Sequence, residues 1–374
     1  MVSLEQRVFL ELVKAGLWER DVTLREYEPV DYSRILQLAT EQSVIGLVTV
    51  GLDYVKDVKA PQEWALQFVG QTIQLEQRNK AMNVFVAELI RVLRKQDIYA
   101  LLVKGQGIAQ CYEKPMWRAS GDVDLFLSDD NYQKAMDSLK AKASSVDDEN
   151  PYNKHLAMVI DGWIVEIHGS LRCGLWKKAD KELDVIKDDI FFSGKVRSWM
   201  NGNTQIFLPA ANEDVVFVFT HILEHYFKEG IGLRQICDWC RLLWTYKESL
   251  DHVLLESRIR QMGVMSEWKT FSTLAIKYLG MPREAMPLYS DSRRLGRKAD
   301  KVMEFILETG NFGHNRDYSY RQKHSYVVFK AISLWRHIAD TFRYFEVFPL
   351  DSIKVFLRKM QVGLSVAIQG KRHE

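Results

Sequence analysis

The spacing of apolar residues changes twice along this chain, and these changes limit the folds it can adopt. From residue 3 to about 95 apolar residues recur every three or four positions, as in TIQLEQRNKAMNVFVAELIRVLRKQD, which is typical of amphipathic helices. Strand-like runs follow: IYALLVKG, DVDLFL and HLAMVIDGWIVEIHGSL, the last with a hairpin turn expected at Asp161-Gly162. Helical spacing returns from PAANEDVVFVFTHILEHYF onward. We therefore predict an α+β protein with a small mixed sheet between two helical regions.

The same changes of spacing set the expected boundaries. We predict an N-terminal helical region at 1–95, a sheet-bearing core at 96–208 and a helical C-terminal domain at 209–374. A length of 374 residues agrees with more than one unit, since an average domain has roughly 150 residues. No repeat or low-complexity linker marks the boundaries, so they depend on the spacing alone.

Composition excludes several classes of protein. The 51 basic and 49 acidic side chains give a formal charge of +2, which is too balanced for a dedicated nucleic-acid binder. Four cysteines are too few for a disulfide scaffold in a chain of this length and indicate a reducing compartment. The N-terminus lacks the pattern of a signal peptide, and no apolar run reaches the ~20 residues of a transmembrane helix. We expect a cytoplasmic protein.

Acidic residues interrupt two of the predicted strands. Side chains alternate between the faces of a strand, so Asp122 and Asp124 share one face, and Glu166 and His168 share one face of theirs. If these strands are neighbours, three carboxylates converge, and their mutual repulsion favours a bound cation. Carboxylate oxygens suit Mg²⁺ or Mn²⁺. In the alternative interpretation, the acids lie on the solvent face of an edge strand.

A glycine-bearing turn precedes the first pair of acids. The strand IYALLVKG ends at Lys104-Gly105, and Gln106 follows at the start of an expected helix. Backbone N–H groups at such a turn can hold a phosphate, and Lys104 can add positive charge. Arg118, four residues before Asp122, is a second candidate phosphate ligand. Together with the acids, this turn indicates a nucleotide site.

The runs LLVKGQGIAQCY, RASGDVDLFL and IVEIHGSL together resemble the nucleotidyltransferase superfamily with a DNA polymerase beta-like core. The resemblance is closest to an uncharacterised bacterial branch, in which a strand ending in Lys-Gly precedes a Tyr, an Arg, an Asp-aliphatic-Asp strand and an acid-aliphatic-His strand. It covers about 96 to 175 and extends more weakly to ILEHYFKEGIGLRQICDWCRLL. The core at 96–208 is thus expected to be a nucleotidyltransferase core.

The resemblance implies a reaction and a set of roles. Asp122 and Asp124 would be the metal-binding pair, and Glu166 the third acid, which in the superfamily helps to activate the attacking hydroxyl. The reaction would move a nucleoside monophosphate from a nucleoside triphosphate to a hydroxyl of a small molecule or protein, the acceptor being unknown. The superfamily's usual Gly-Ser turn is Gly105-Gln106 here. This difference keeps a second hypothesis open, namely an inactive nucleotide- or partner-binding module with the same fold.

Several other residues carry two interpretations each. Arg234 could reach the nucleotide from a helix packed across the site or could pair with Asp238 one turn away. His168 could support the acids or simply be hydrogen-bonded in the sheet. For His221 and His225, core or surface positions are favoured over metal ligation.

Two further sequence features, a C-x-x-C pair and a basic-aromatic segment, each allow two interpretations. Cys237 and Cys240 match the redox spacing C-x-x-C, but a helical pattern surrounds them, so a structural role is favoured. The segment RHIADTFRYFEVFPLDSIKVFLRKMQVG, at 336–363, mixes basic and aromatic residues. We expect a helix packed on its own domain, with peripheral contact to an anionic membrane as the alternative.

Overall fold

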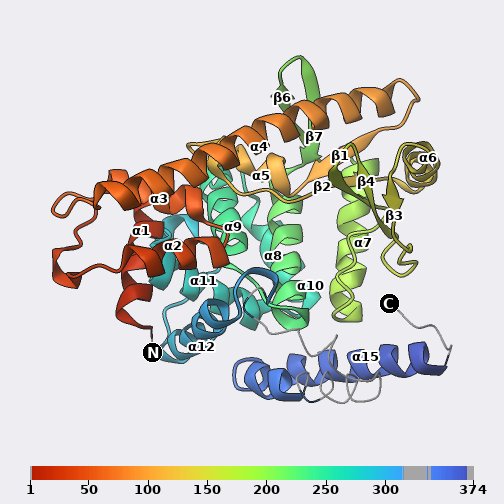
Figure 1. Cartoon of the computed structure of the whole chain (residues 1–374). Helices are drawn as coiled ribbons and strands as arrows, with labels where there is room; N and C mark the ends of the chain where they lie inside the picture. Colours follow the sequence, from red (N-terminus) through yellow and green to blue (C-terminus); the bar gives the residue numbers. More distant parts are fainter. Residues whose placement is uncertain (1, 314, 316–334, 336–337, 369–374) are drawn as a thin grey trace.

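A computed structural model of the chain describes residues 2–313, 315, 335 and 338–368, which form one mixed sheet with helices from both ends of the sequence (Figure 1). This architecture confirms the predicted α+β class. The helices before the sheet are α1 (Leu4–Trp18), η1 (Arg25–Tyr27), α2 (Tyr32–Glu41), α3 (Ile45–Asp53) and α4 (Gln62–Arg94). Side-chain caps define the starts of α1 and α2: the Ser3 side chain accepts from the backbone N–H of Gln6, and that of Asp31 accepts from the backbone N–H of Arg34.

The sheet has seven strands in the order β3-β4-β5-β2-β1-β7-β6. Their bounds are β1 (Ala100–Val103), β2 (Val123–Leu127), β3 (Ser145–Val146), β4 (His155–Ile160), β5 (Trp163–His168), β6 (Val196–Asn201) and β7 (Thr204–Pro209). Strand β2 runs antiparallel to β1 and parallel to β5. The strand that carries the paired acids is therefore an interior strand, which rules out the edge-strand alternative.

The remaining helices connect the strands or follow them. They are α5 (Gly105–Ala109), η2 (Pro115–Trp117), α6 (Asp129–Lys140), α7 (Lys177–Phe192), α8 (Ala211–Lys228), α9 (Leu233–Tyr246), α10 (His252–Met262), α11 (Met265–Leu279), η3 (Arg283–Ala285), α12 (Arg293–Thr309), η4 (Asn311–Gly313) and α15 (Pro349–Ile368). Within the described residues, none of these helices has both the length and the apolar character to cross a membrane. Of the segment at 336–363, residues 336 and 337 lie outside the described residues, and α15 covers its later part.

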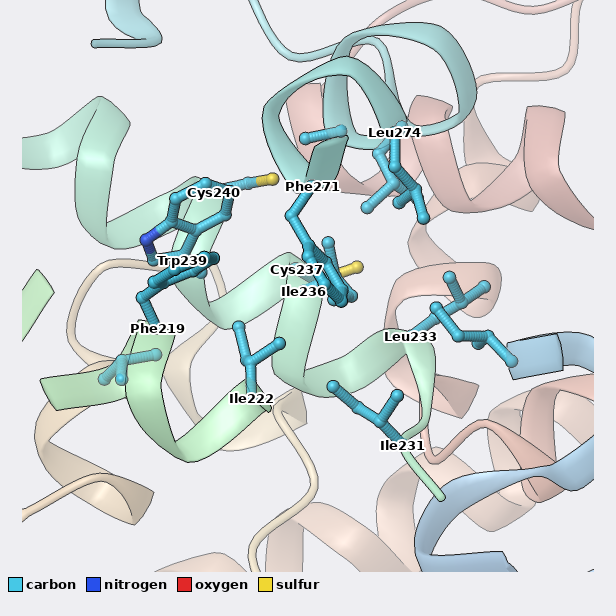
Figure 2. Packing of buried hydrophobic residues seen from close by; sticks show 14 of the residues in the cluster. Phe219, Ile222, Ile231, Leu233, Ile236, Cys237, Trp239, Cys240, Phe271 and Leu274 are labelled. Carbon is cyan, nitrogen blue, oxygen red and sulfur yellow. The ribbon is translucent and has the colours of Figure 1, made fainter. Parts of the chain in front are cut away.

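Two hydrophobic clusters cover opposite faces of the sheet. One face packs against α4 and α6 through residues such as Val86, Leu125 and Ile167. The other face joins a larger cluster built from the N-terminal helices and from α7 to α12. At its centre the rings of Phe219, Trp239 and Trp268 lie with centroids 4.8 to 5.2 Å apart, and Figure 2 shows the packing around α9. This cluster holds α8 and α9 beside the acidic end of the sheet.

The sheet contains one hairpin that the sequence predicts and one that it does not. Asp161 and Gly162 join β4 to β5 with φ of 50° and 79°, so both residues adopt the left-handed conformations that a tight hairpin turn requires. The hairpin of β6 and β7 was not predicted, although Asn201-Gly202 is a recognisable turn signal. The division into units at 96 and 209 stays a prediction.

A buried carboxyl group lies where α11 meets the start of α15. Glu267, in the first turn of α11, is fully buried, and burial together with the neighbouring Asp351 raises its pKa from 4.5 to about 8. Because the folded state favours the protonated form, the stability contributed by this group is complete below pH 4.5 and is lost as the pH rises toward 8.

We therefore expect Glu267→Gln to be more stable than the wild type at pH 8, by on the order of 4 kcal/mol, and similar to it near pH 4. Urea unfolding at several pH values measures the difference. Glu284→Gln, on the exposed turn η3, is the matched control and should leave the pH profile unchanged. Parallel profiles for wild type and Glu267→Gln would contradict this assignment.

Candidate functional site

Three acidic side chains meet at the junction of β2 and β5. The parallel register places Asp124 directly beside Glu166, and Asp122 immediately precedes β2. Their carboxylates offer oxygen atoms that all lie within 4.8 Å of one another. The strand residues Val123 and Leu125 point the other way, into the cluster under α4. Alternation along the strand thus separates an apolar face from an acidic one, as the sequence indicates.

The Lys104 side chain reaches this acidic cluster from the end of β1. Its Nζ lies 2.7 Å from Oδ1 of Asp124, and both side chains are largely buried. Burial disfavours the charged ammonium, but the negative charges of Asp124, Asp122 and Glu166 outweigh that effect and raise the pKa of Lys104. The Lys104 backbone has φ 57° and ψ −143°, an uncommon conformation for a residue other than glycine, and such residues often mark functional sites.

Two histidines connect to the same acids. His168 Nε2 lies 2.8 Å from Oδ1 of Asp124 and 3.6 Å from Oε2 of Glu166. His155, on β4, places its Nε2 3.0 Å from the same Glu166 oxygen. His155 is a site residue that our sequence reasoning missed. The two-residue turn at Asp161-Gly162 could have revealed it, because counting outward from that turn pairs position 155 with 168.

The neighbouring groups shift the pKa values of Asp122 and Glu166 in opposite directions. The charge of Asp124, followed by burial, raises the pKa of Asp122. For Glu166, burial acts to raise the pKa, but the hydrogen bond from His155 and the proximity of the His168 ring outweigh it and lower the pKa well below its usual range. Glu166 is therefore held as a carboxylate, whereas Asp122 is the acid whose charge is least compensated.

The two residues of the glycine turn lie in different surroundings: Gly105 borders a cavity, and the Gln106 side chain is buried in the interior. Gly105 lines a small cavity together with Lys104 and Asp122, and its φ of 39° suits glycine. Gln106 is buried instead, with its Nε2 3.5 Å from Oδ1 of Asn79 on α4 and its Oε1 accepting from the Ser120 hydroxyl at 3.2 Å. The structure thus brings Gly105 to the acids and turns the Gln106 side chain away from them.

The two candidate arginines border the same small cavity but differ in their contacts. Arg118 forms a bidentate pair with Asp238, with Nε–Oδ1 and Nη2–Oδ2 distances of 3.0 and 2.6 Å, and both residues are buried. Arg234 donates from Nη1 to the carbonyl oxygen of Ala119 at 3.0 Å. The Asp238 carboxylate is thus bound by Arg118, 120 positions away in sequence, and not by the helical neighbour Arg234. Arg234 faces the cavity that contains Asp122 and Asp124.

A larger cleft of about 440 Å³ opens on the other side of the acids. Glu166 and both sheet histidines form one wall, and α8 forms the other with His221, Glu224 and His225. His221, Lys104 and Asp122 line this cleft and the small cavity alike, so the two spaces adjoin. The volume is in the range of small-molecule sites. That His221 borders both spaces was not predicted.

The C-x-x-C pair lies away from this cleft. Cys237 and Cys240 are fully buried on α9 among apolar side chains (Figure 2). Burial raises the pKa of both thiols. Such thiols are protonated and poorly reactive, which agrees with the structural role expected from the sequence.

The fold and the acidic end of its sheet define a class of protein. An acid on β2, a second immediately before it and a third on the adjacent parallel strand, with a lysine-glycine turn beside them, form the arrangement that the resemblance to nucleotidyltransferases implies. The chain belongs to a family described as uncharacterised nucleotidyltransferase, whose model matches residues 28–279. No curated protein and no solved structure gives a match to the chain.

Proposed function

We propose that the chain moves a nucleoside monophosphate from a nucleoside triphosphate to a hydroxyl of a small molecule or protein. The convergence of Asp122, Asp124 and Glu166 at the edge of a cleft is the observation that carries this proposal. The acceptor oxygen forms a bond to the α-phosphorus, the bond from that phosphorus to its bridging oxygen breaks, and pyrophosphate leaves with the bonding electrons. In such reactions a protein mainly positions the reactants and offsets charge.

The donor set of the acidic cluster fits a hard divalent cation. Three carboxylates supply oxygen ligands, and the raised pKa of Asp122 reflects excess negative charge from Asp124. When bound by these acids, Mg²⁺ or Mn²⁺ would offset the charge that develops on the phosphate oxygens. The hydrogen bond from His155 and the nearby His168 ring keep Glu166 ionised, which suits a metal ligand.

The other roles follow from position. Lys104 and Gly105 border the small cavity and would bind the triphosphate, with Arg234 as a further cation on the opposite wall. Arg118, already paired with Asp238, would act by holding α9 against the core. The larger cleft beyond Glu166 leaves space for the acceptor.

The inactive binding module remains a second candidate for one specific reason. The superfamily's usual turn serine is replaced by Gln106, whose side chain binds Asn79 and Ser120 in the interior. A triphosphate would therefore rely on backbone N–H groups and on Lys104. Turnover distinguishes the two functions.

The test is an acceptor screen with α-labelled ATP, GTP, CTP and UTP in the presence of Mg²⁺ or Mn²⁺. Acceptors are pools of sugars, sugar phosphates, nucleosides and hydroxyl-bearing proteins, including the chain itself. We expect transfer of the label to one acceptor class with one pyrophosphate released for each transfer. Nucleotide binding without label transfer or pyrophosphate release in any combination would favour the binding module.

We expect Lys104→Met to weaken nucleotide binding by about tenfold or more, since a hydrogen bond to a charged group contributes about 1.5–3 kcal/mol. Calorimetric titration with each Mg²⁺–nucleoside triphosphate measures the affinity. Lys80→Met removes an exposed lysine from α4 and should leave the affinity unchanged. Wild-type affinity in a folded Lys104→Met chain would remove this lysine from the site.

A further inference from the structure

Two histidines and a carboxylate form a hydrogen-bonded chain on the α8 wall of the cleft. Nε2 of His221 and Nε2 of His225 are 3.1 Å apart, and Nδ1 of His225 lies 3.3 Å from Oε2 of Glu229. These residues are spaced four apart at the C-terminal end of α8, so they follow one face of the helix. These hydrogen-bonded side chains extend from the end of α8 to the junction of the two cavities.

The carboxylate at the end of this hydrogen-bonded series determines which ring nitrogen of each histidine carries a proton. A carboxylate can only accept, so His225 donates from Nδ1 to Glu229 and, as a neutral ring, presents a lone pair at Nε2. His221 must then donate from Nε2 to His225. Its own Nδ1 carries the remaining lone pair and can accept a proton.

His221 lies where the two spaces adjoin. It borders the small cavity that contains Lys104 and Gly105 and also the larger cleft that contains Glu166. In the proposed reaction, the acceptor hydroxyl and the α-phosphate meet where these two spaces adjoin.

The charged and titratable groups around His221 favour its neutral form. Lys104, Asp122, Glu166 and His168 face it from the sheet side, and Glu224 and His225 lie beside it on α8. Burial, followed by the positive charge of Lys104, lowers the pKa of His221 well below its usual value. A neutral ring at pH 7 has its lone pair available.

Resting on the proposed nucleotidyl transfer, we propose that His221 accepts the proton of the acceptor hydroxyl, and that His225 and Glu229 are positioning residues that fix its tautomer. The proton moves from the hydroxyl to Nδ1 of His221 as the oxygen bonds to the α-phosphorus and pyrophosphate departs. Oε2 of Glu224 lies 3.9 Å from this Nδ1 and would offset the positive charge of the protonated ring. The proton later returns to solvent through the open cleft.

The kinetic test uses α-labelled ATP, GTP, CTP and UTP with Mg²⁺ and follows pyrophosphate release in the presence of the acceptor pools of the screen. We expect His221→Gln to lower kcat by about 10²- to 10⁴-fold with little change in KM, in the range of general-base contributions. The wild-type rate should reach a plateau as His221 loses its proton, whereas the His221→Gln rate should keep rising with hydroxide concentration. Glu229→Gln should shift the wild-type pH profile. His252→Gln, an exposed histidine of α10, is the control and should change neither rate nor profile.

A second measurement is independent of turnover. Long-range ¹H–¹⁵N spectra of histidine-labelled protein at pH 7, assigned with the His221→Gln and His225→Gln variants, should show His225 protonated at Nδ1 and His221 at Nε2. The opposite tautomer of either ring, a positively charged His221, or a wild-type rate for folded His221→Gln would overturn the inference while leaving nucleotidyl transfer intact. A wild type that releases no pyrophosphate and transfers no label with any nucleotide and any acceptor pool would instead overturn the proposed function and the base role with it.

Discussion

Replacing Asp124 with asparagine should lower pyrophosphate release by at least about 1000-fold, which corresponds to about 4 kcal/mol of transition-state stabilisation. Asp124 is the most deeply buried of the three acids, and its Oδ1 meets both Lys104 and His168. Asparagine keeps the shape of the side chain but removes the negative charge that would hold a divalent cation. The loss should therefore appear in kcat and in metal affinity, with the fold retained.

The matched control is Asp130→Asn, at an exposed position in the first turn of α6 on the same connection from β2. It should keep wild-type activity and metal affinity. Metal binding is followed by Mn²⁺ titration with electron paramagnetic resonance, and folding by circular dichroism. A folded Asp124→Asn chain that releases pyrophosphate at the wild-type rate would show that these acids are not the metal site.

Local patterns in the sequence predict the acidic site well because its parts lie within single strands. Alternation along β2 separates Asp124 from Val123 and Leu125, and the Asp161-Gly162 turn defines the hairpin that carries Glu166. The parallel pairing of β2 with β5 has no local signal, since it joins strands about 40 positions apart. The sequence predicts which residues share a face, and the tertiary structure decides which faces meet.

Contacts between distant helices are harder to predict for the same reason. Helical spacing suggests an Arg234–Asp238 pair, but the Asp238 carboxylate binds Arg118, because a loop before β2 brings a guanidinium to it in bidentate geometry. The role suggested here for His221 likewise depends on α8 packing beside the sheet. Spacing alone favours a core or surface histidine there, and only the packed structure shows that His221 lines both cavities.

Asp238→Ala should lower the free energy of unfolding by about 3–5 kcal/mol, because it leaves a buried guanidinium without its partner. Asp238 also accepts from the Tyr112 hydroxyl at 2.7 Å, so the substitution removes three hydrogen bonds that join α9 to the core. Asp300→Ala is the matched control: Asp300 also binds a cation and a tyrosine hydroxyl, from Lys277 and Tyr278, but its side chain is 40% exposed. Its loss should cost about 1 kcal/mol or less. Guanidinium chloride unfolding compares the two, and equal losses would show that burial does not set the strength of the Arg118 pair.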